Sequence, residues 1–568
     1  MTTTRGATLW ERIHPAWVGL LGLALYLRTI PYGFVLRDDP WLIRDNRLLH
    51  EWSLPSVWTV LTDFSWEQRY RLGAEYLPVR DLSVMLDYAL YGDWVGGQHL
   101  TQVVLYGATC AVLATLVLAL FGSRPLAWLT GVLFATHPVH VEVVAWLSER
   151  KGALGAFLLS SSLLIATGYL RRGGFGRALA ACLLFLLAVA AKALVIAGAA
   201  ALMLVVLWLD SPVSRRGKTL LVTAYAASGL LAFLPNVWVS RSLGVIVPYH
   251  GEGFADTLLL FLQAHTQYLR LMAYGGPYAI DYPIEPGAAG AARWLPGALA
   301  AVLGLVALLW AVFDRSKRNA ATFGIAWWFV FLAPVSHLLV PVQNYAADRY
   351  LFLPSFGLLL AFSSWLMKLP RAVSLALGGA TLIVACAWTV VQTPVWSSTE
   401  QLFDNAVRAD PNNADAWDQL ASLASNRGDL ERAWAYTRLG LEHSPGHWRL
   451  IHRQGLLLAS EGKLDEAIEA MEHAASVPES HKAYANLAML YLKRGRRDEA
   501  LRSAEEAVRL QPDTAHNQRV LGIVAFEIGE TDQACRAFER AFALDPYDEN
   551  NVSNLDLCAS KGANGREP

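Results

Sequence analysis

The sequence predicts an all-α protein, in which a polytopic membrane helical bundle of about eleven spans is followed by a superhelical array of short helices. Two observations carry this prediction. Residues 1 to about 396 form a series of apolar runs, whereas the residues from 397 onward are charged and follow a helical pattern. Charged residues make up only 17% of the chain, below the usual quarter, because the first part contains few of them. We therefore expect a membrane domain at 1–396, an array at 397–550 and a polar tail at 551–568.

Eleven apolar runs are counted as membrane spans. They lie at about 15–35, 97–121, 126–146, 152–170, 177–191, 193–209, 218–236, 294–313, 319–340, 350–367 and 372–393. With the N-terminus inside, five connections face the cytoplasm, and all five are basic, as the positive-inside rule demands. Their basic residues are Arg124, Arg171, Arg172, Arg177, Arg215, Arg216, Lys218, Arg315, Lys317, Arg318, Lys368 and Arg371.

One further segment, 258–275, is apolar enough to be a span but also contains several polar residues. Counting it would place the basic connection at 315–318 outside, against the positive-inside rule. We therefore expect an interfacial or re-entrant helix on the outer face.

This topology places the loop at 37–96 and the whole array on the outer face. A loop of such length is usually functional. Short connections and Ala/Gly/Leu-rich spans suit a bacterial inner-membrane protein, whose outer face is periplasmic, and in a eukaryote the same face would be the ER lumen. The net charge of −1 gives no case for nucleic acid binding. The five cysteines show no spacing typical of a zinc site or a disulfide framework.

A period of about 34 residues begins after Pro394. Three sets of residues keep it: Gly428, Gly462, Gly495 and Gly529; Pro411, Pro445, Pro478, Pro512 and Pro546; and Ala433, Ala467, Ala500 and Ala534. This is the tetratricopeptide pattern, in which two helices meet at a tight glycine turn, cross at a small residue and end near a proline. We expect four repeats at about 413–549 after a leading helix at 397–411. Such arrays present a concave face to peptides or proteins, although an array that only packs on the membrane domain remains an alternative.

Asp38 and Asp39 stand side by side where the first apolar segment ends. Carboxylates at this boundary are costly in lipid but cheap in the interface. A positioned carboxylate can remove the proton of an acceptor hydroxyl during attack, so either aspartate is a candidate catalytic base. A solvated pair of loop charges is the plainer alternative.

Further charged residues stand at span ends on the same predicted face. The candidates for binding the phosphate of a lipid-linked donor are Arg150, Lys151, Lys192 and Arg349. Arginine gives bidentate contacts to phosphate and lysine gives a point charge, so these residues could form a basic pocket at headgroup depth. Each could instead be a snorkelling side chain at the interface.

His137, His140, Glu142 and Tyr350 are the candidates for binding substrate. Two histidines three residues apart, with a nearby glutamate, suggest a metal-binding site. Pro138 interrupts the helical geometry and no fourth ligand is evident, so we expect no metal here. Hydrogen bonds to a substrate or to the outer loop are the favoured roles.

Several stretches carry a resemblance to a known family. They are Phe34-Val35-Leu36-Arg37-Asp38-Asp39, Tyr76-Leu77-Pro78-Val79-Arg80, Leu86-Asp87-Tyr88-Ala89-Leu90, His137-Pro138-Val139-His140-Val141-Glu142-Val143-Val144-Ala145-Trp146 and Asp348-Arg349-Tyr350-Leu351-Phe352-Leu353-Pro354-Ser355. With the repeats, the chain resembles the transmembrane and TPR repeat-containing proteins, which are similar to GT-C glycosyltransferases of the protein O-mannosyltransferase kind. The resemblance covers nearly the whole chain.

The resemblance implies an integral membrane glycosyltransferase that moves a mannose-like sugar from a polyprenyl-phosphate donor to a protein or glycan acceptor. It implies that the repeats recruit the acceptor and that Asp38 or Asp39 is the catalytic carboxylate, while metal dependence stays open. The chain departs from the family pattern at Leu77, Ala191, Ala193, Glu149 and Gly152. These departures leave open a pseudo-enzyme. Two further alternatives are a non-catalytic membrane-anchored scaffold and a ligase of lipid-linked glycans.

Overall fold

The computed structural model describes residues 13–245, 249, 253–274, 277–280, 282, 284, 290–339, 341–342, 344–477, 480–545 and 548–564. These residues form helices and their connections, and no strand occurs among them, which confirms the all-α prediction. The chain forms two compact units, Met1–Leu402 and Phe403–Pro568. The division thus falls slightly after the boundary expected at residue 396.

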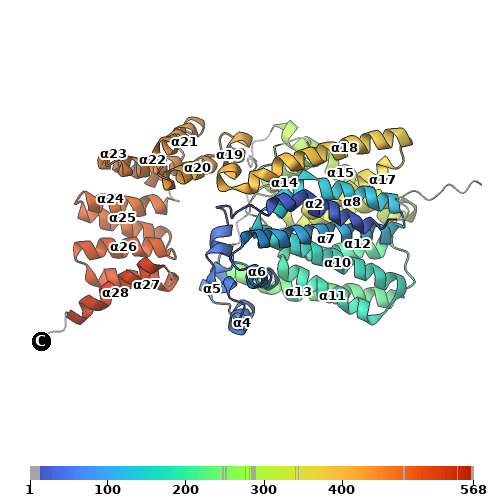
Figure 1. Ribbon diagram of the computed structural model, residues 1–568, viewed down its shortest axis with the longest axis horizontal. Helices are drawn as coiled ribbons and strands as arrows, with labels where there is room; N and C mark the ends of the chain where they lie inside the picture. Colours follow the sequence, from blue (N-terminus) through green and yellow to red (C-terminus); the bar gives the residue numbers. More distant parts are fainter. Residues whose placement is uncertain are drawn as a thin grey trace, which may run out of the picture. The chain divides into compact units, whose positions relative to one another are not determined.

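Six helices of the first unit, within the described residues, are long and apolar enough to cross a membrane. Three of them are α7 (Val95–Phe121), α13 (Arg215–Ser242) and α15 (Ala291–Phe313). The other three are α10 (Arg150–Arg172), α17 (Phe352–Leu366) and α18 (Arg371–Gln392), each of which is long enough together with the short turn next to it, over Leu147–Arg172, Asp348–Leu366 and Arg371–Ser397. Three other predicted spans form shorter apolar helices, α11 (Phe175–Ala191), α12 (Gly198–Trp208) and α16 (Ala320–Leu332). Figure 1 shows α10 between α7 and α11, and it packs on both.

The remaining two predicted spans, at 15–35 and 126–146, are shorter helices than expected. The first is α2 (Val18–Tyr26), which is flanked by the short turns η1 (Pro15–Trp17) and η2 (Leu27–Thr29). The second is α8 (Arg124–Thr136). It ends early because His137 precedes Pro138 and takes an extended backbone, with φ −71° and ψ 126°, which cannot continue a helix. Residues 137–149 then form the short turns η4 (Pro138–His140), α9 (Val141–Ala145) and η5 (Leu147–Glu149).

The segment expected to be interfacial or re-entrant, 258–275, lies largely within α14 (Phe254–Met272). This helix is not among the six apolar candidates, and it packs on α15. Its buried side includes the polar residues Gln263, His265 and Thr266. The contact is close, because a Cβ added at Gly297 of α15 would lie 2.3 Å from the carbonyl oxygen of Leu262.

A second close contact joins α16 to α17 through two glycines. A Cβ added at Gly324 would lie 2.2 Å from the carbonyl oxygen of Gly357, and one added at Gly357 would lie 2.3 Å from the carbonyl oxygen of Gly324. Small residues allow helix backbones in a membrane bundle to approach in this way.

We expect Gly324→Ala to destabilise the first unit by about 1–3 kcal/mol, because the new methyl group meets backbone that cannot move aside. The measurement is the apparent melting temperature in detergent. Gly379→Ala in α18 is the matched control, since a Cβ there meets nothing within 4 Å. Equal melting temperatures for the two variants would contradict the prediction.

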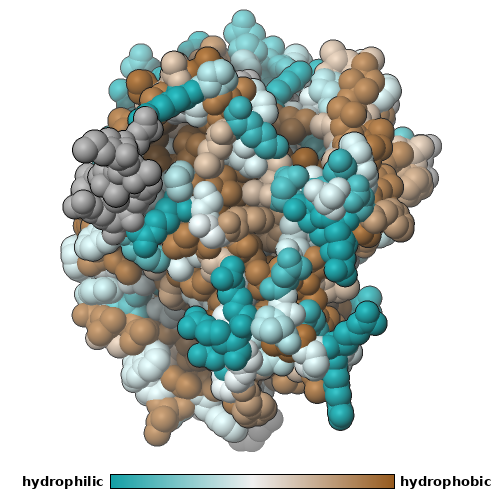
Figure 2. Space-filling view, turned by 90° about the vertical axis from the view of Figure 1, so that its right-hand side faces the viewer, coloured by the Kyte–Doolittle hydropathy of each residue, from teal (hydrophilic) through white to brown (hydrophobic). Residues whose placement is uncertain are grey.

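Three of the basic connections meet at one end of the first unit. The Arg318 guanidinium donates to the carbonyl oxygen of Leu207 at 2.8 Å, and the Ser211 hydroxyl donates to that of Leu170 at 2.5 Å. Figure 1 shows this end on the right, and Figure 2 looks onto it, with hydrophilic patches beside apolar flanks. Because α10 has 23 residues, its start at Arg150 lies about 35 Å away from this end.

The outer loop predicted at 37–96 is mostly helical. Its elements are η3 (Pro40–Arg44), α3 (Arg47–His50), α4 (Leu54–Thr62), α5 (Trp66–Arg71) and α6 (Pro78–Tyr91). They share a hydrophobic cluster that includes Leu42, Ile43, Val60, Leu72 and Met85, to which Leu147 of η5 also belongs. This cluster fixes the loop against the turns before α10.

The second unit consists of antiparallel helix pairs, as the 34-residue period predicts. The leading helix α19 (Thr399–Ala409) crosses the division between the units and is followed by α20 (Ala414–Asn426) and α21 (Leu430–His443), α22 (Trp448–Ser460) and α23 (Leu464–Ala475), α24 (His481–Lys493) and α25 (Arg497–Leu510), and α26 (Ala515–Ile528) and α27 (Thr531–Leu544). Each pair turns at a glycine with positive φ, at 428, 462, 495 and 529. The four periodic alanines are fully buried. Pro478 and Pro546 lie outside the described residues.

The predicted polar tail contains a further helix, α28 (Glu549–Asn564). The Asn551 side chain donates to the carbonyl oxygens of Ala541 and Asp545, as Asn517 does to those of Ala507 and Gln511 one repeat earlier. The helix therefore packs on α27 in the same way as α26 packs on α25. A disulfide joins its Cys558 to Cys535 of α27. Cysteine spacing does not predict this bond, because the two residues meet only when α28 packs on α27.

Candidate active site

The two neighbouring aspartates have different environments. Asp39 is 1% exposed, and its Oδ1 accepts hydrogen bonds from the backbone N–H of Ser148 at 2.9 Å and from the Ser148 hydroxyl at 2.5 Å. Its Oδ2 accepts from the backbone N–H of Val35 at 3.1 Å. Both oxygens of Asp39 are thus occupied in tying the end of the first helical segment to η5.

Asp38 is partly exposed, and its carboxylate makes no hydrogen bond or ion pair with the residues that the structure describes. The buried guanidinium of Arg80 lies within electrostatic range of it. Asp38 is therefore accessible to an incoming hydroxyl, whereas Asp39 fixes the backbone of the turn to Ser148.

The same turn is held from a second side. The backbone N–H of Leu36 donates to the hydroxyl of Thr399 at 2.8 Å, and Thr399 is the first residue of α19. Three residues before Thr399, the ring of Trp396 stacks on that of Trp146, with centroids 5.6 Å apart. Asp38 therefore lies in a turn that is fixed at Leu36 and again at Asp39.

Burial raises the pKa of Asp39 to about 6, against the opposing effect of its hydrogen bonds from Ser148 and Val35. An unfolded chain releases this proton near pH 4, so the folded state binds it more tightly. Protonation of Asp39 thus stabilises the folded state at low pH by about 3 kcal/mol. This stabilisation is lost as the pH rises from about 4 to about 6.

We expect the apparent melting temperature of the wild-type chain to fall over this pH range relative to that of the Asp39→Asn variant, which cannot titrate there. Thermal scans at pH 4.0–7.0 measure this difference. Parallel curves for the two proteins would contradict it.

Three of the four predicted phosphate-binding cations gather at the start of α10, and each has a carboxylate partner. Lys151 Nζ is 2.8 Å from Glu75 Oε2, and Lys192 Nζ is 2.9 Å from Glu149 Oε2. The Arg349 guanidinium and backbone N–H both contact the carboxylate of Glu142, at 2.5 and 2.8 Å. The sequence predicts a basic pocket, whereas the structure has a network in which positive and negative side chains alternate.

Accessibility differs along this network. Arg349 is 9% exposed and Lys192 13%, whereas Lys151 and Glu75 are 25% and 30% exposed. Although burial opposes it, Lys151 and Arg80 lower the pKa of Glu75. The network thus stays ionised at its accessible end, where an anionic group could reach Lys151.

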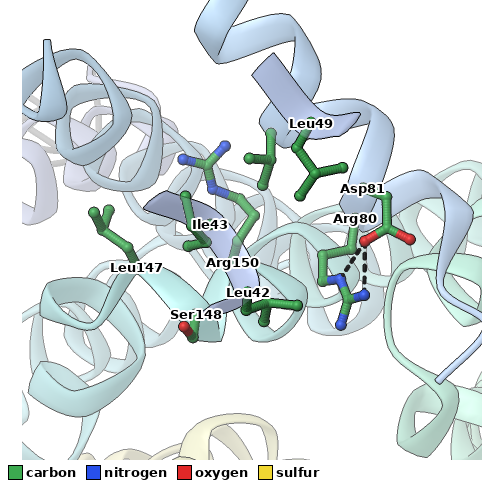
Figure 3. Close-up of a pocket in the computed structure, with 9 residues that line it drawn as sticks. Leu42, Ile43, Leu49, Arg80, Asp81, Leu147, Ser148 and Arg150 are labelled. Carbon is green, nitrogen blue, oxygen red and sulfur yellow. Dashed lines mark hydrogen bonds and ion pairs between the residues drawn. The ribbon is translucent and has the colours of Figure 1, made fainter. Parts of the chain in front are cut away.

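The fourth predicted cation, Arg150, points elsewhere. Its guanidinium contacts Asp87 at 2.6 Å, the side-chain oxygen of Gln102 at 2.8 Å and the carbonyl oxygen of Gln98 at 2.9 Å. It is 2% exposed, and Figure 3 shows its guanidinium directed away from the Ser148 side chain. These contacts join α10 to α6 and α7, so Arg150 has a structural role.

Ser148 also lines a small cavity, which has room for no more than about one water molecule. Figure 3 shows the residues that line it: Leu42, Ile43, Leu49, Arg80, Asp81, Val84, Leu147, Ser148 and Arg150. The Arg80 guanidinium binds Asp81 at 2.6 Å. Burial raises the pKa of Asp81, and Arg80 opposes this shift. The cavity is below the usual size of a ligand pocket.

The two histidines are fully buried. His137 contacts the carbonyl oxygen of Met272 at 3.3 Å, and its Nδ1 accepts from the backbone N–H of Val139. The His140 ring lies between the hydroxyls of Tyr106, at 3.0 Å, and Ser355, at 2.9 Å. The structure therefore places both rings in contacts between helices rather than beside Asp38.

Glu142 and Tyr350, the other two predicted substrate-binding residues, both contact Arg349. Glu142 is its ion-pair partner, and the guanidinium carbon lies 5.1 Å from the centre of the Tyr350 ring. The same guanidinium lies 5.6 Å from the centre of the Trp146 ring. These side chains fix the direction of Arg349.

Comparisons with known proteins bear on both units. Two family models, each described as "Tetratricopeptide repeat", match residues 402–435 and 458–524. Protein O-mannosyl-transferase TMTC1 of Homo sapiens is 24% identical over 504 residues, which are 76% of this chain and 55% of that protein. Protein O-mannosyl-transferase TMTC4 of Homo sapiens is 25% identical over 498 residues, 75% of this chain and 66% of that protein.

Protein O-mannosyl-transferase TMTC3 of Homo sapiens is 24% identical over 571 residues, which cover 86% of this chain and 60% of that protein. The chain is a relative of the TPR-containing protein O-mannosyl-transferases. It spans 55% to 66% of the length of these three relatives. This similarity and the six apolar helices identify an integral membrane protein with tetratricopeptide repeats.

Three residues of the charged network in this relative of the O-mannosyl-transferases are not among the site residues predicted from the sequence. Glu75, Glu149 and Arg80 belong to the charged network. Glu75 and Glu149 pair with lysines from other parts of the chain, and Arg80 pairs with Glu75 within the outer loop. One signal was available for Glu149, because it stands between Ser148 and Arg150 in a run of polar residues at a span end.

Proposed function

We propose that the chain is a membrane glycosyltransferase of the GT-C type, which moves a mannose-like sugar from a polyprenyl-phosphate donor to a protein or glycan acceptor. The single observation that carries the proposal is the partly exposed carboxylate of Asp38, held in a fixed turn that Asp39 ties to the start of α10. The lysines and arginine of the charged network gather at that same helix start.

In this reaction the acceptor oxygen attacks the anomeric carbon of the sugar. The new carbon–oxygen bond forms as the bond from that carbon to the phosphate oxygen breaks. Asp38 takes the acceptor proton as general base, and the bonding pair leaves with the polyprenyl phosphate. Lys151, Lys192 and Arg349 would stabilise the negative charge that develops on this leaving phosphate.

The proposed site faces the outer side of the membrane. The basic connections lie at the opposite end of α10, as expected for the cytoplasmic side. The Cys535–Cys558 disulfide supports an oxidising compartment for the second unit, since such bonds persist outside the cytosol. In a bacterium this is the periplasm, and in a eukaryote it is the ER lumen.

The second unit is proposed to recruit the acceptor. Tetratricopeptide repeats form extended concave surfaces that suit peptides and proteins. A direct transfer assay identifies the sugar and the acceptor.

The test is to incubate the purified full chain, in lipid nanodiscs, with a panel of polyprenyl-phosphate sugars and to follow donor consumption and transfer to peptide acceptors. Consumption of the mannosyl donor in preference to glucosyl and galactosyl donors is the expected result. Failure to consume any donor, with a folded protein, would favour a scaffold or a pseudo-enzyme.

A further inference from the structure

Glu149 occupies the centre of the charged network. It is the last residue before α10 and is 2% exposed. Its Oε2 lies 2.9 Å from Lys192 Nζ, and its Oε1 lies 3.8 Å from Arg349 Nε. Lys151 is also within electrostatic range of it.

The three cations around Glu149 come from separate elements. Lys192 stands in the connection after α11, Arg349 in the short turn η9 (Asp348–Leu351) before α17, and Lys151 in the first turn of α10. Like charges at close range repel, and this repulsion is strong where water is scarce. Glu75 and Glu142 hold the two outer cations from the far sides, whereas Glu149 lies between them.

Gly152 explains how the Glu149 carboxylate fits against the helix. A Cβ added at Gly152 would lie 2.6 Å from Glu149 Oε2 and 3.2 Å from Lys192 Nζ. Residues three apart on a helix share a face, so a side chain at 152 would begin where the Glu149 carboxylate now lies. The carboxylate therefore fills a place that could also be reached from position 152.

We infer that Glu149 is a positioning residue, which gathers Lys151, Lys192 and Arg349 into one binding site for the phosphate of the lipid donor. The inference rests on the proposed function and extends it to a residue that does not touch the reacting atoms. Gly152 provides the room that this arrangement requires. Without the central carboxylate, Lys192 loses its ion-pair partner and the cations separate.

The test uses the full chain in nanodiscs and undecaprenyl phosphate as the probe. We expect Glu149→Gln and Glu149→Ala to weaken its binding by about 10- to 100-fold, the effect that the loss of a supporting contact has on metal affinity at metal sites. Adding Gly152→Asp to the Glu149→Ala variant restores a carboxylate at the same place and should recover most of the affinity. In transfer assays, the donor KM should rise more than kcat falls. Glu67→Gln, at an exposed position of α5, is the control.

Three outcomes decide the matter once melting temperatures show that the variants are folded. Glu149→Gln that binds as tightly as the wild type, or more tightly, overturns the inference. So does a double variant that binds no better than Glu149→Ala. A folded wild-type chain that does not bind the probe overturns both the proposed donor and the inference. If the wild type binds the probe and the Glu149 variants bind it equally well, only the positioning role of Glu149 is refuted.

Discussion

Asp38→Asn is expected to lower sugar transfer by about 10²- to 10⁴-fold, the usual contribution of a general base. The amide keeps the size of the side chain but cannot accept the acceptor proton. Because the Asp38 carboxylate makes no hydrogen bond or ion pair with the described residues, its loss should leave the melting temperature unchanged. Binding of the lipid phosphate should also persist. The measurement is the initial transfer rate at saturating donor.

Two comparisons make this result specific to Asp38. Asp93→Asn changes an exposed carboxylate of the same outer loop and should retain full activity. Asp39→Asn should lower the activity by a different route, because its amide group would face the backbone N–H of Val35, which needs an acceptor. Wild-type activity of the Asp38→Asn variant would refute the role of this residue as base.

Arg349→Ala should destabilise the first unit by about 3–5 kcal/mol, because it leaves Glu142 buried and without its ion-pair partner. Both oxygens of this carboxylate contact Arg349, and Glu142 is 1% exposed. The variant should therefore give a low yield of folded protein and a strongly reduced melting temperature. Arg349→Lys keeps the charge but loses the second guanidinium contact, to the side-chain oxygen of Asn344, so an intermediate effect is expected.

The control for this prediction is Arg241→Ala, which changes an exposed arginine at the end of α13 and should shift stability by no more than about 0.5 kcal/mol. Adding Glu142→Gln to Arg349→Ala should restore part of the lost stability, since the unpaired charge is then removed. A melting temperature for Arg349→Ala equal to that of the control would show that the pair is not structurally important.

The architecture was largely predictable, because it follows from local patterns. Apolar runs locate helices such as α7 and α15, and the recurring glycines locate the turns of the array. The prediction was less accurate where a local signal competed with hydropathy. Pro138 ends α8, although the apolar run continues to Trp146. The sequence of α28 predicts a polar tail because it lacks the periodic residues, whereas its packing on α27 is a tertiary feature.

The site was less predictable, because its distinctions arise from contacts across the chain. Asp38 and Asp39 are equivalent in sequence, and only the approach of Ser148 buries one of them. The sequence identifies the cationic residues but not their ion-pair partners, since Glu142 and Arg349 are 207 residues apart. Whether Arg150 faces the network or α6 is likewise decided by the position of Asp87.

The bond between Leu36 and Thr399 determines how truncated forms of this protein must be designed. A chain cut at the compositional boundary, after residue 396, would lose the hydroxyl that holds the Asp38 turn as well as the array. Reduced activity in such a form would then be assigned wrongly to the missing repeats. A cut within the connection after Ala409 retains all of α19 and separates these two effects.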